Sequence, residues 1–166
     1  VCATTPLIRR IVTVTGDAIA QPQNFSVRLG TNYRMLVDAA GGFKAEPEKI
    51  ISGGPMMGQA LFSLDIPVMK NSSALTCFVK DEVATSPETP CIRCGRCVEV
   101  CPGHVVPQLM ADAAARHDLA LFEKLNGMEC CECGSCTFIC PAHRPLTQAF
   151  KEMRKAVMAE RRKKKA

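Results

Sequence analysis

The sequence predicts an α+β protein in which a strand-rich part is followed by a helical part. Runs of β-branched and alternating apolar residues occur within residues 8–79, and helical apolar patterns follow residue 106. A polar stretch with two prolines, residues 80–90 (KDEVATSPETP), separates them and is expected to be a linker. At 166 residues, the chain has room for one medium domain or two small ones.

The first part, residues 1–79, is expected to form a small β-grasp-like domain. Residues 8–15 (IRRIVTVT) are rich in β-branched side chains, and residues 25–29 (FSVRL) alternate apolar with polar, so both predict strands. A short helix is expected over residues 32–40, before a pair of glycines that typically ends a helix. Residues 50–51 predict another strand. Strand, strand, helix, strand is the order of a small β-grasp-like domain.

Two further segments of this part have structural interpretations. Residues 52–58 (SGGPMMG) lack the spacing of a phosphate-binding loop, so we expect a tight structural loop. Residues 75–79 form a short strand-like run in which Cys77 is expected to act as a small hydrophobic residue.

The second part is marked by its cysteines. Eight of the eleven cysteines form two copies of the spacing C-x2-C-x2-C-x3-C-P, at Cys91, Cys94, Cys97, Cys101 and at Cys130, Cys133, Cys136, Cys140. This spacing is typical of bacterial two-cluster ferredoxins, in which three close thiolates hold one iron–sulfur cube and the fourth ligates the other. By that pattern, one [4Fe–4S] cluster would bind Cys91, Cys94, Cys97 and Cys140, and the second Cys130, Cys133, Cys136 and Cys101.

Zinc and disulfides are the competing interpretations of these cysteines. Zinc sites favour separated C-x2-C pairs or cysteine mixed with histidine, whereas each copy here offers a triplet, a more distant single and a proline. Disulfides are disfavoured by the odd cysteine count and by crowding. Three cysteines lie outside the two motifs: Cys2, Cys77 and Cys131. The side chain of Cys131, next to Cys130, is expected to project elsewhere as a packed or spare thiol rather than a ligand, and neither Cys131 nor Cys77 is assigned a function.

Residues 91–145 are therefore expected to form a helical two-cluster ferredoxin-type domain. One helix is expected to begin near Pro107, because proline suits a first helical turn, and another to be capped by Asp118. Residues 104 and 143 are histidines three positions after each fourth cysteine; surface placement is expected, with a hydrogen bond to a cluster as the alternative.

Residues 146–166 are expected to form an amphipathic helix with a basic tail. Leu146, Phe150, Met153 and Val157 recur at helical spacing and should pack on the cluster domain. Residues 161–165 (RRKKK) would either contact anionic lipid or an acidic partner, or form a frayed, solvated tail.

Charge and composition narrow the possible functions. The formal net charge of +5 comes entirely from residues 146–166, which carry eight basic and two acidic side chains. No nucleic-acid partner is expected. No apolar stretch approaches the eighteen or so residues that cross a bilayer, so any membrane contact is expected to be peripheral. No hydrolytic triad, carboxylate pair or HExxH motif is present, and no catalytic residue is assigned.

Several segments together resemble the RnfC component of the Rnf electron transport complex. They are PLIRRIVTVTGDAI (residues 6–19), GGF (41–43), SGGPMMG (52–58), IPVMK (66–70), CIRCGRCVEVCP (91–102) and CCECGSCTFICPAHRPL (130–146). The resemblance implies a membrane-bound, ion-translocating oxidoreductase that exchanges electrons between ferredoxin and NAD. The RnfC component would be its peripheral part on the cytoplasmic side of the cell membrane. Its β-grasp region would be of the soluble-ligand-binding (SLBB) type.

The resemblance also implies that FMN and NADH bind an N-terminal domain outside these 166 residues. Because the chain starts at Val1, we expect it to be a piece of a longer protein. Its expected function is that of an electron carrier with two [4Fe–4S] clusters, and its expected partners are the other Rnf proteins of the complex and ferredoxin. The alternatives are a docking module with structural clusters and an electron-transfer protein like the cobalamin reductases of bacterial microcompartments.

Overall fold

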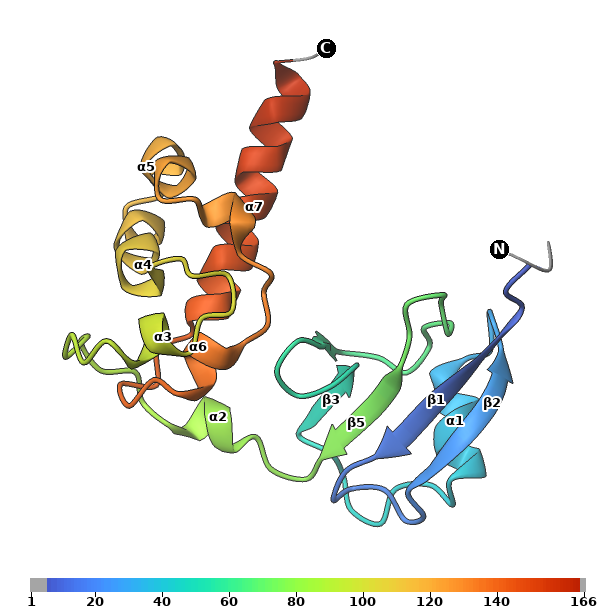
Figure 1. Ribbon diagram of the computed structural model, residues 1–166. Coiled ribbons are helices and arrows are strands. Elements are labelled where there is room, and N and C mark those ends of the chain that lie inside the picture. Colours follow the sequence, from blue (N-terminus) through green and yellow to red (C-terminus); the bar gives the residue numbers. More distant parts are fainter. Residues whose placement is uncertain (1–5, 165–166) are drawn as a thin grey trace. The chain divides into compact units, whose positions relative to one another are not determined.

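The computed structural model describes residues 6–164, so Cys2 and Lys165 lie outside the described part (Figure 1). The chain forms two compact units that divide between Glu82 and Val83, within the segment predicted as a linker. This segment contains a short helix, α2 (Glu82–Thr85), that its polar composition did not predict.

The first unit is built on a mixed five-stranded sheet with strand order β2-β1-β5-β3-β4. The strands β1 and β5 run parallel, and the other neighbouring pairs are antiparallel. The strands are β1 (Arg9–Thr15), β2 (Gln23–Arg28), β3 (Lys49–Ser52), β4 (Gln59–Leu61) and β5 (Ala74–Phe78), and the helix α1 (Tyr33–Ala39) lies between β2 and β3 in the chain. This arrangement fits the β-grasp-like region that the sequence predicts.

The core of this unit lies between the sheet and α1. Val12 and Val14 alternate inward from β1 and pack in one cluster with the buried face of α1, including Leu36 and Val37. Cys77 on β5 is fully buried in the same core, as the sequence predicts. Burial raises the pKa of the Cys77 thiol to about 11, because the charged thiolate would lose its hydration.

A hydrogen-bond network satisfies the one tyrosine of the chain, Tyr33. Its ring is buried, and its hydroxyl lies 2.9 Å from the Ser52 hydroxyl and donates to the Ser72 hydroxyl at 2.9 Å. The Ser72 oxygen also accepts from the Met69 backbone N–H at 2.9 Å. This network joins α1 to β3 and to the loop that precedes β5.

The SGGPMMG segment connects β3 to β4, and the β4 strand was not predicted. A Cβ at Gly58 would lie 2.4 Å from Cγ2 of Ile51, so the turn needs a residue without a side chain. The tight structural loop is therefore confirmed.

The second unit consists of helices connected by the two cysteine-bearing loops. They are α3 (Arg96–Glu99), α4 (Pro107–Ala115), α5 (Leu119–Lys124), the 3₁₀ turn η1 (Gly127–Glu129), α6 (Ser135–Phe138) and α7 (Leu146–Lys163). The expected start at Pro107 and the Asp118 cap are confirmed, since the Asp118 carboxylate accepts from the Leu121 N–H at 2.9 Å. The one-turn helices α3 and α6 were not predicted.

Helix α7 supplies much of the core of this unit. All four residues of its predicted stripe, Leu146, Phe150, Met153 and Val157, are buried. They pack with Met110 of α4 and Phe122 of α5, whose ring centroid lies 6.2 Å from that of Phe150.

The basic end of α7 is helical rather than frayed as far as Lys163. The Arg161 guanidinium forms an ion pair with Glu123 of α5 at 2.6 Å, and residues 161–164 remain exposed. None of the helices within residues 6–164 combines the length and the apolar character needed to span a bilayer.

Tyr33→Phe tests the buried hydroxyl network. We expect it to lower the free energy of unfolding of the first unit by about 1 to 2 kcal/mol, because Ser72 loses a buried partner. Urea unfolding followed by circular dichroism measures this. The exposed Ser26→Ala on β2 is the control, and an effect equal to that of Tyr33→Phe would contradict the expectation.

Candidate iron–sulfur cluster sites

The two cysteine motifs fold as an internal repeat. Each residue of the second copy lies 39 positions after its equivalent in the first, as Cys130 does after Cys91. Arg93 and Glu132 occupy equivalent positions with φ of 56° and 57°. Gly95 and Gly134 follow with φ of 78° and 86°. Each loop therefore has two residues in the left-handed backbone conformation, which bend the chain into a tight turn.

This turn directs backbone N–H groups toward sulfur. The Arg93 N–H donates to Sγ of Cys91 at 3.4 Å, and the Glu132 N–H donates to Sγ of Cys130 at the same distance. A hydrogen bond to the thiolate favours its charged form, which is the form that ligates metal. The helices α3 and α6 then begin directly after the glycines, so the third cysteine of each copy lies in a first helical turn.

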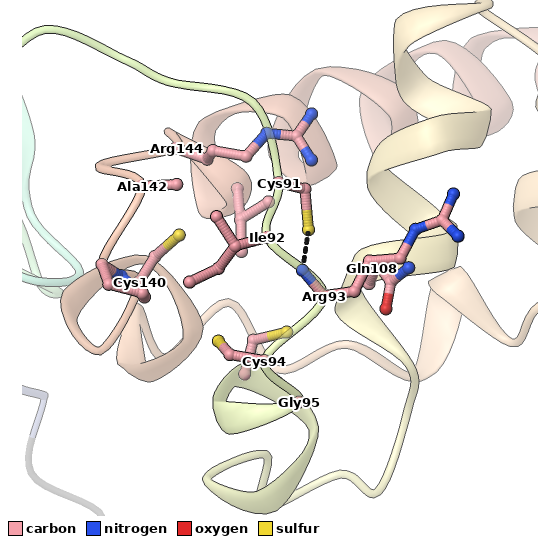
Figure 2. A pocket seen from close by; sticks show the side chains of 12 residues that line it. Cys91, Ile92, Arg93, Cys94, Gly95, Gln108, Cys140, Ala142 and Arg144 are labelled. Atoms are coloured by element: carbon pink, nitrogen blue, oxygen red, sulfur yellow. Dashed lines mark hydrogen bonds between the residues drawn. The ribbon is translucent and has the colours of Figure 1, made fainter.

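A first hollow is lined by Cys91, Cys94 and Cys97 of the first copy together with Cys140 of the second. Figure 2 shows the labelled Cys91, Cys94 and Cys140 around it, with the Arg93 N–H directed at the Cys91 sulfur.

A second hollow is lined by Cys130, Cys133 and Cys136 of the second copy together with Cys101 of the first. Cys131, which is exposed, lines it as well, and the direction of its side chain stays a prediction. Val105 and Phe150 contribute an apolar wall.

Each hollow is lined by four of the cysteines that the sequence assigns to one cluster. Within residues 6–164, no three His, Cys, Asp or Glu side chains are arranged to hold a metal ion. A tetrahedral zinc site needs every sulfur about 2.3 Å from one atom, whereas a cube spreads its four thiolates around four irons. The presence of cubes in these hollows stays a prediction.

The two hollows differ in exposure. Cys91 and Cys94 of the first are exposed, whereas Cys136 of the second is buried. Burial raises the pKa of Cys97, Cys130 and Cys136, because a thiolate without a metal would lose hydration there. The hydroxyl of Ser135, 3.4 Å from Sγ of Cys133, lowers the pKa of that thiol.

Thr147 in the first turn of α7 is a site residue that the sequence did not reveal. Its hydroxyl lies 3.8 Å from Sγ of Cys136 and 2.8 Å from the hydroxyl of Thr137. The Thr137 hydroxyl also accepts from the Thr147 N–H at 2.9 Å, so it satisfies a donor that a helix start leaves open. The sequence signal that could have identified Thr147 is a threonine at the start of a helix, close to the second cysteine motif.

Arg154, two turns further along α7, was also missed. Its guanidinium donates to the Cys130 carbonyl and forms an ion pair with Glu132 at 3.2 Å. The histidines at 104 and 143 are exposed, as expected, and each donates its backbone N–H to the carbonyl of the fourth cysteine at 3.2 and 3.1 Å.

Comparison with known proteins finds relatives for both units. The family model of the SLBB domain matches residues 11–60. Over 158 residues, 95% of this chain, the sequence is 46% identical to the C subunit of the Na⁺-translocating ferredoxin:NAD⁺ oxidoreductase complex of Acetobacterium woodii, of which it covers 36%.

Two further relatives match a smaller share. The C subunit of the proton-translocating ferredoxin:NAD⁺ oxidoreductase complex of Clostridium ljungdahlii is 51% identical over 64% of this chain and 23% of its own length. The C subunit of the ion-translocating oxidoreductase complex of Yersinia pestis is 46% identical over 62% of this chain and 17% of its own length. The chain thus spans little more than a third, or less, of these curated relatives.

Gly95→Ala tests the left-handed turn of the first loop. A Cβ there meets nothing within 4 Å, so the expected cost is backbone strain alone, about 1 kcal/mol. We expect the anaerobically reconstituted Gly95→Ala variant to lose its visible absorbance at a lower urea concentration than the unsubstituted chain. Gly103→Ala, at a glycine outside the left-handed region whose Cβ would lie 3.5 Å from the Glu129 oxygen, is the control. Equal effects of the two variants would refute the strain argument.

Proposed function

We propose, from the homology of this chain to one part of the RnfC component of ion-translocating ferredoxin:NAD oxidoreductase complexes, that it relays electrons through two [4Fe–4S] clusters. The observation that carries the proposal is the grouping of thiols. Each hollow gathers three cysteines of one copy and the fourth of the other, which is the ligand pattern of two-cluster ferredoxins.

The surroundings of the hollows suit bound clusters. Cys91, Cys94, Cys97 and Cys140 would hold the first, and Cys130, Cys133, Cys136 and Cys101 the second. Each cluster, when bound, would accept and release one electron reversibly. The side chains of Val105 and Phe150 would exclude water from the second site, and the N–H groups of Arg93 and Glu132 would stabilise thiolate charge.

The two proposed cluster sites lie in the same unit, and the first of them is exposed to solvent. Helices α3 and α6 pack against each other, so the two hollows belong to one small unit. The exposed Cys91 and Cys94 would let the first cluster exchange electrons at the surface, while the buried Cys136 belongs to the second. Electrons would therefore pass between the surface and the interior of this unit.

The complex itself is proposed from the relatives' names. The parent protein would be a peripheral component of a membrane-associated translocase on its cytoplasmic side, with other Rnf proteins and ferredoxin as partners. FMN and NADH would bind a further domain of that protein. The SLBB unit would serve in docking or ligand binding.

Paired cysteine variants test which thiols share a cluster. Cys94→Ala/Cys140→Ala removes two ligands of the first proposed site, so about four irons per chain should remain. Cys136→Ala/Cys140→Ala removes one ligand from each site, so both clusters should be lost or converted. Iron and sulfide content and electron paramagnetic resonance of the anaerobically reconstituted, reduced chain measure this.

The reciprocal pair is the matched control. Cys136→Ala/Cys101→Ala should again leave one intact cluster, and Cys94→Ala/Cys101→Ala none. If the pairs within one motif, Cys94 with Cys101 and Cys136 with Cys140, preserved a cluster instead, each copy would hold its own cube. A colourless wild-type chain that binds zinc in place of iron would overturn the relay.

A further inference from the structure

Arg154 and Glu132 form a charge pair at the second hollow. Arg154 lies on α7 and reaches the loop of the second copy, where its guanidinium donates to the Cys130 carbonyl. It also forms the 3.2 Å ion pair with Glu132, whose own N–H donates to Sγ of Cys130. Their side chains are 27% and 32% exposed, so solvent screens both charges only in part.

The two copies of the repeat differ in charge at this position. The residue equivalent to Glu132 is Arg93, which lines the first hollow. The first hollow also has Arg144, which pairs with Glu88 at 3.3 Å rather than with a residue of the cysteine loop. The ion pair between Glu132 and Arg154 of α7 is therefore particular to the second site.

We propose that Arg154 and Glu132 set the reduction potential of the second cluster with opposite signs, Arg154 raising it and Glu132 lowering it. This inference rests on the proposed function, because it needs a cluster held by Cys101, Cys130, Cys133 and Cys136. Arg154 acts here as a positioning and tuning residue rather than as a ligand.

The sign follows from the charge change on reduction. One electron enters the cluster from a one-electron reductant and no bond is made or broken, so the site gains one negative charge. A nearby cation stabilises that state and a nearby anion destabilises it, more strongly where water is partly excluded.

A purely structural role of the pair makes a different prediction. Either substitution would break the same ion pair and loosen the same loop, so both variants would change the site in the same direction. A charge role requires opposite directions. The pair can therefore separate the two roles, which a single variant cannot do.

The experiment measures the potential of the second cluster in the full chain carrying Cys91→Ala/Cys94→Ala, so that only that site is intact. Arg154→Gln and Glu132→Gln are compared by dithionite titration under anaerobic conditions, with the reduced signal followed by electron paramagnetic resonance. We expect a negative shift for Arg154→Gln and a positive shift for Glu132→Gln. Arg154→Lys, which keeps the charge, should stay closer to the starting chain than Arg154→Gln.

Lys155→Gln is the matched control, because it removes the same charge from the next, exposed residue of α7 and should leave the potential unchanged. Shifts of the same sign for Arg154→Gln and Glu132→Gln, or no shift in either, would overturn the proposal. If Arg154→Gln failed to retain the cluster, the potential of Glu132→Gln would decide the test. A shift of that potential that is not positive would refute the proposal. Absence of a second cluster in the wild-type chain would instead refute the proposed function.

Discussion

The placement of Cys101 and Cys140, each at the hollow of the other copy, is the constraint that organises the second unit. Each hollow is lined by three cysteines of one copy and one of the other, so in the proposed arrangement neither copy completes a site alone. The fourth cysteine lies just beyond the one-turn helix of its copy, and α3 must therefore pack against α6. The helices between the copies, α4 and α5, must return the chain to this point.

Helix α7 shows how one element serves both packing and the site. Its apolar stripe completes the core, and the rotation that buries Phe150 and Met153 also directs Thr147 and Arg154 toward the second hollow. The environment of that site therefore depends on the same helix register that the core requires. A shift of α7 by one residue would remove both polar contacts as well as the buried stripe.

The sequence was most informative where chemistry fixes spacing. The cysteine triplets, the Asp118 cap and the stripe of α7 follow from ligand geometry, a local hydrogen bond and helical periodicity. Strand β4 and the helices α3 and α6 were missed because three or four residues carry too little periodicity to recognise. Arg154 was missed because its contacts join distant segments, which no local pattern encodes, and Thr147 because one threonine at a helix start is a weak signal.

The two units differ in how far their cores depend on metal. The first unit buries a continuous apolar core with its tyrosine hydroxyl satisfied, and the core cysteine Cys77 lines neither hollow. In the second unit, Cys136 is itself a core residue, and Cys97, Cys101 and Cys130 pack against that core. The sulfurs proposed as ligands there thus belong to core side chains or to side chains packed against the core. Because metal binding to such thiolates contributes directly to folding, cluster loss should unfold or loosen the second unit and leave the first intact.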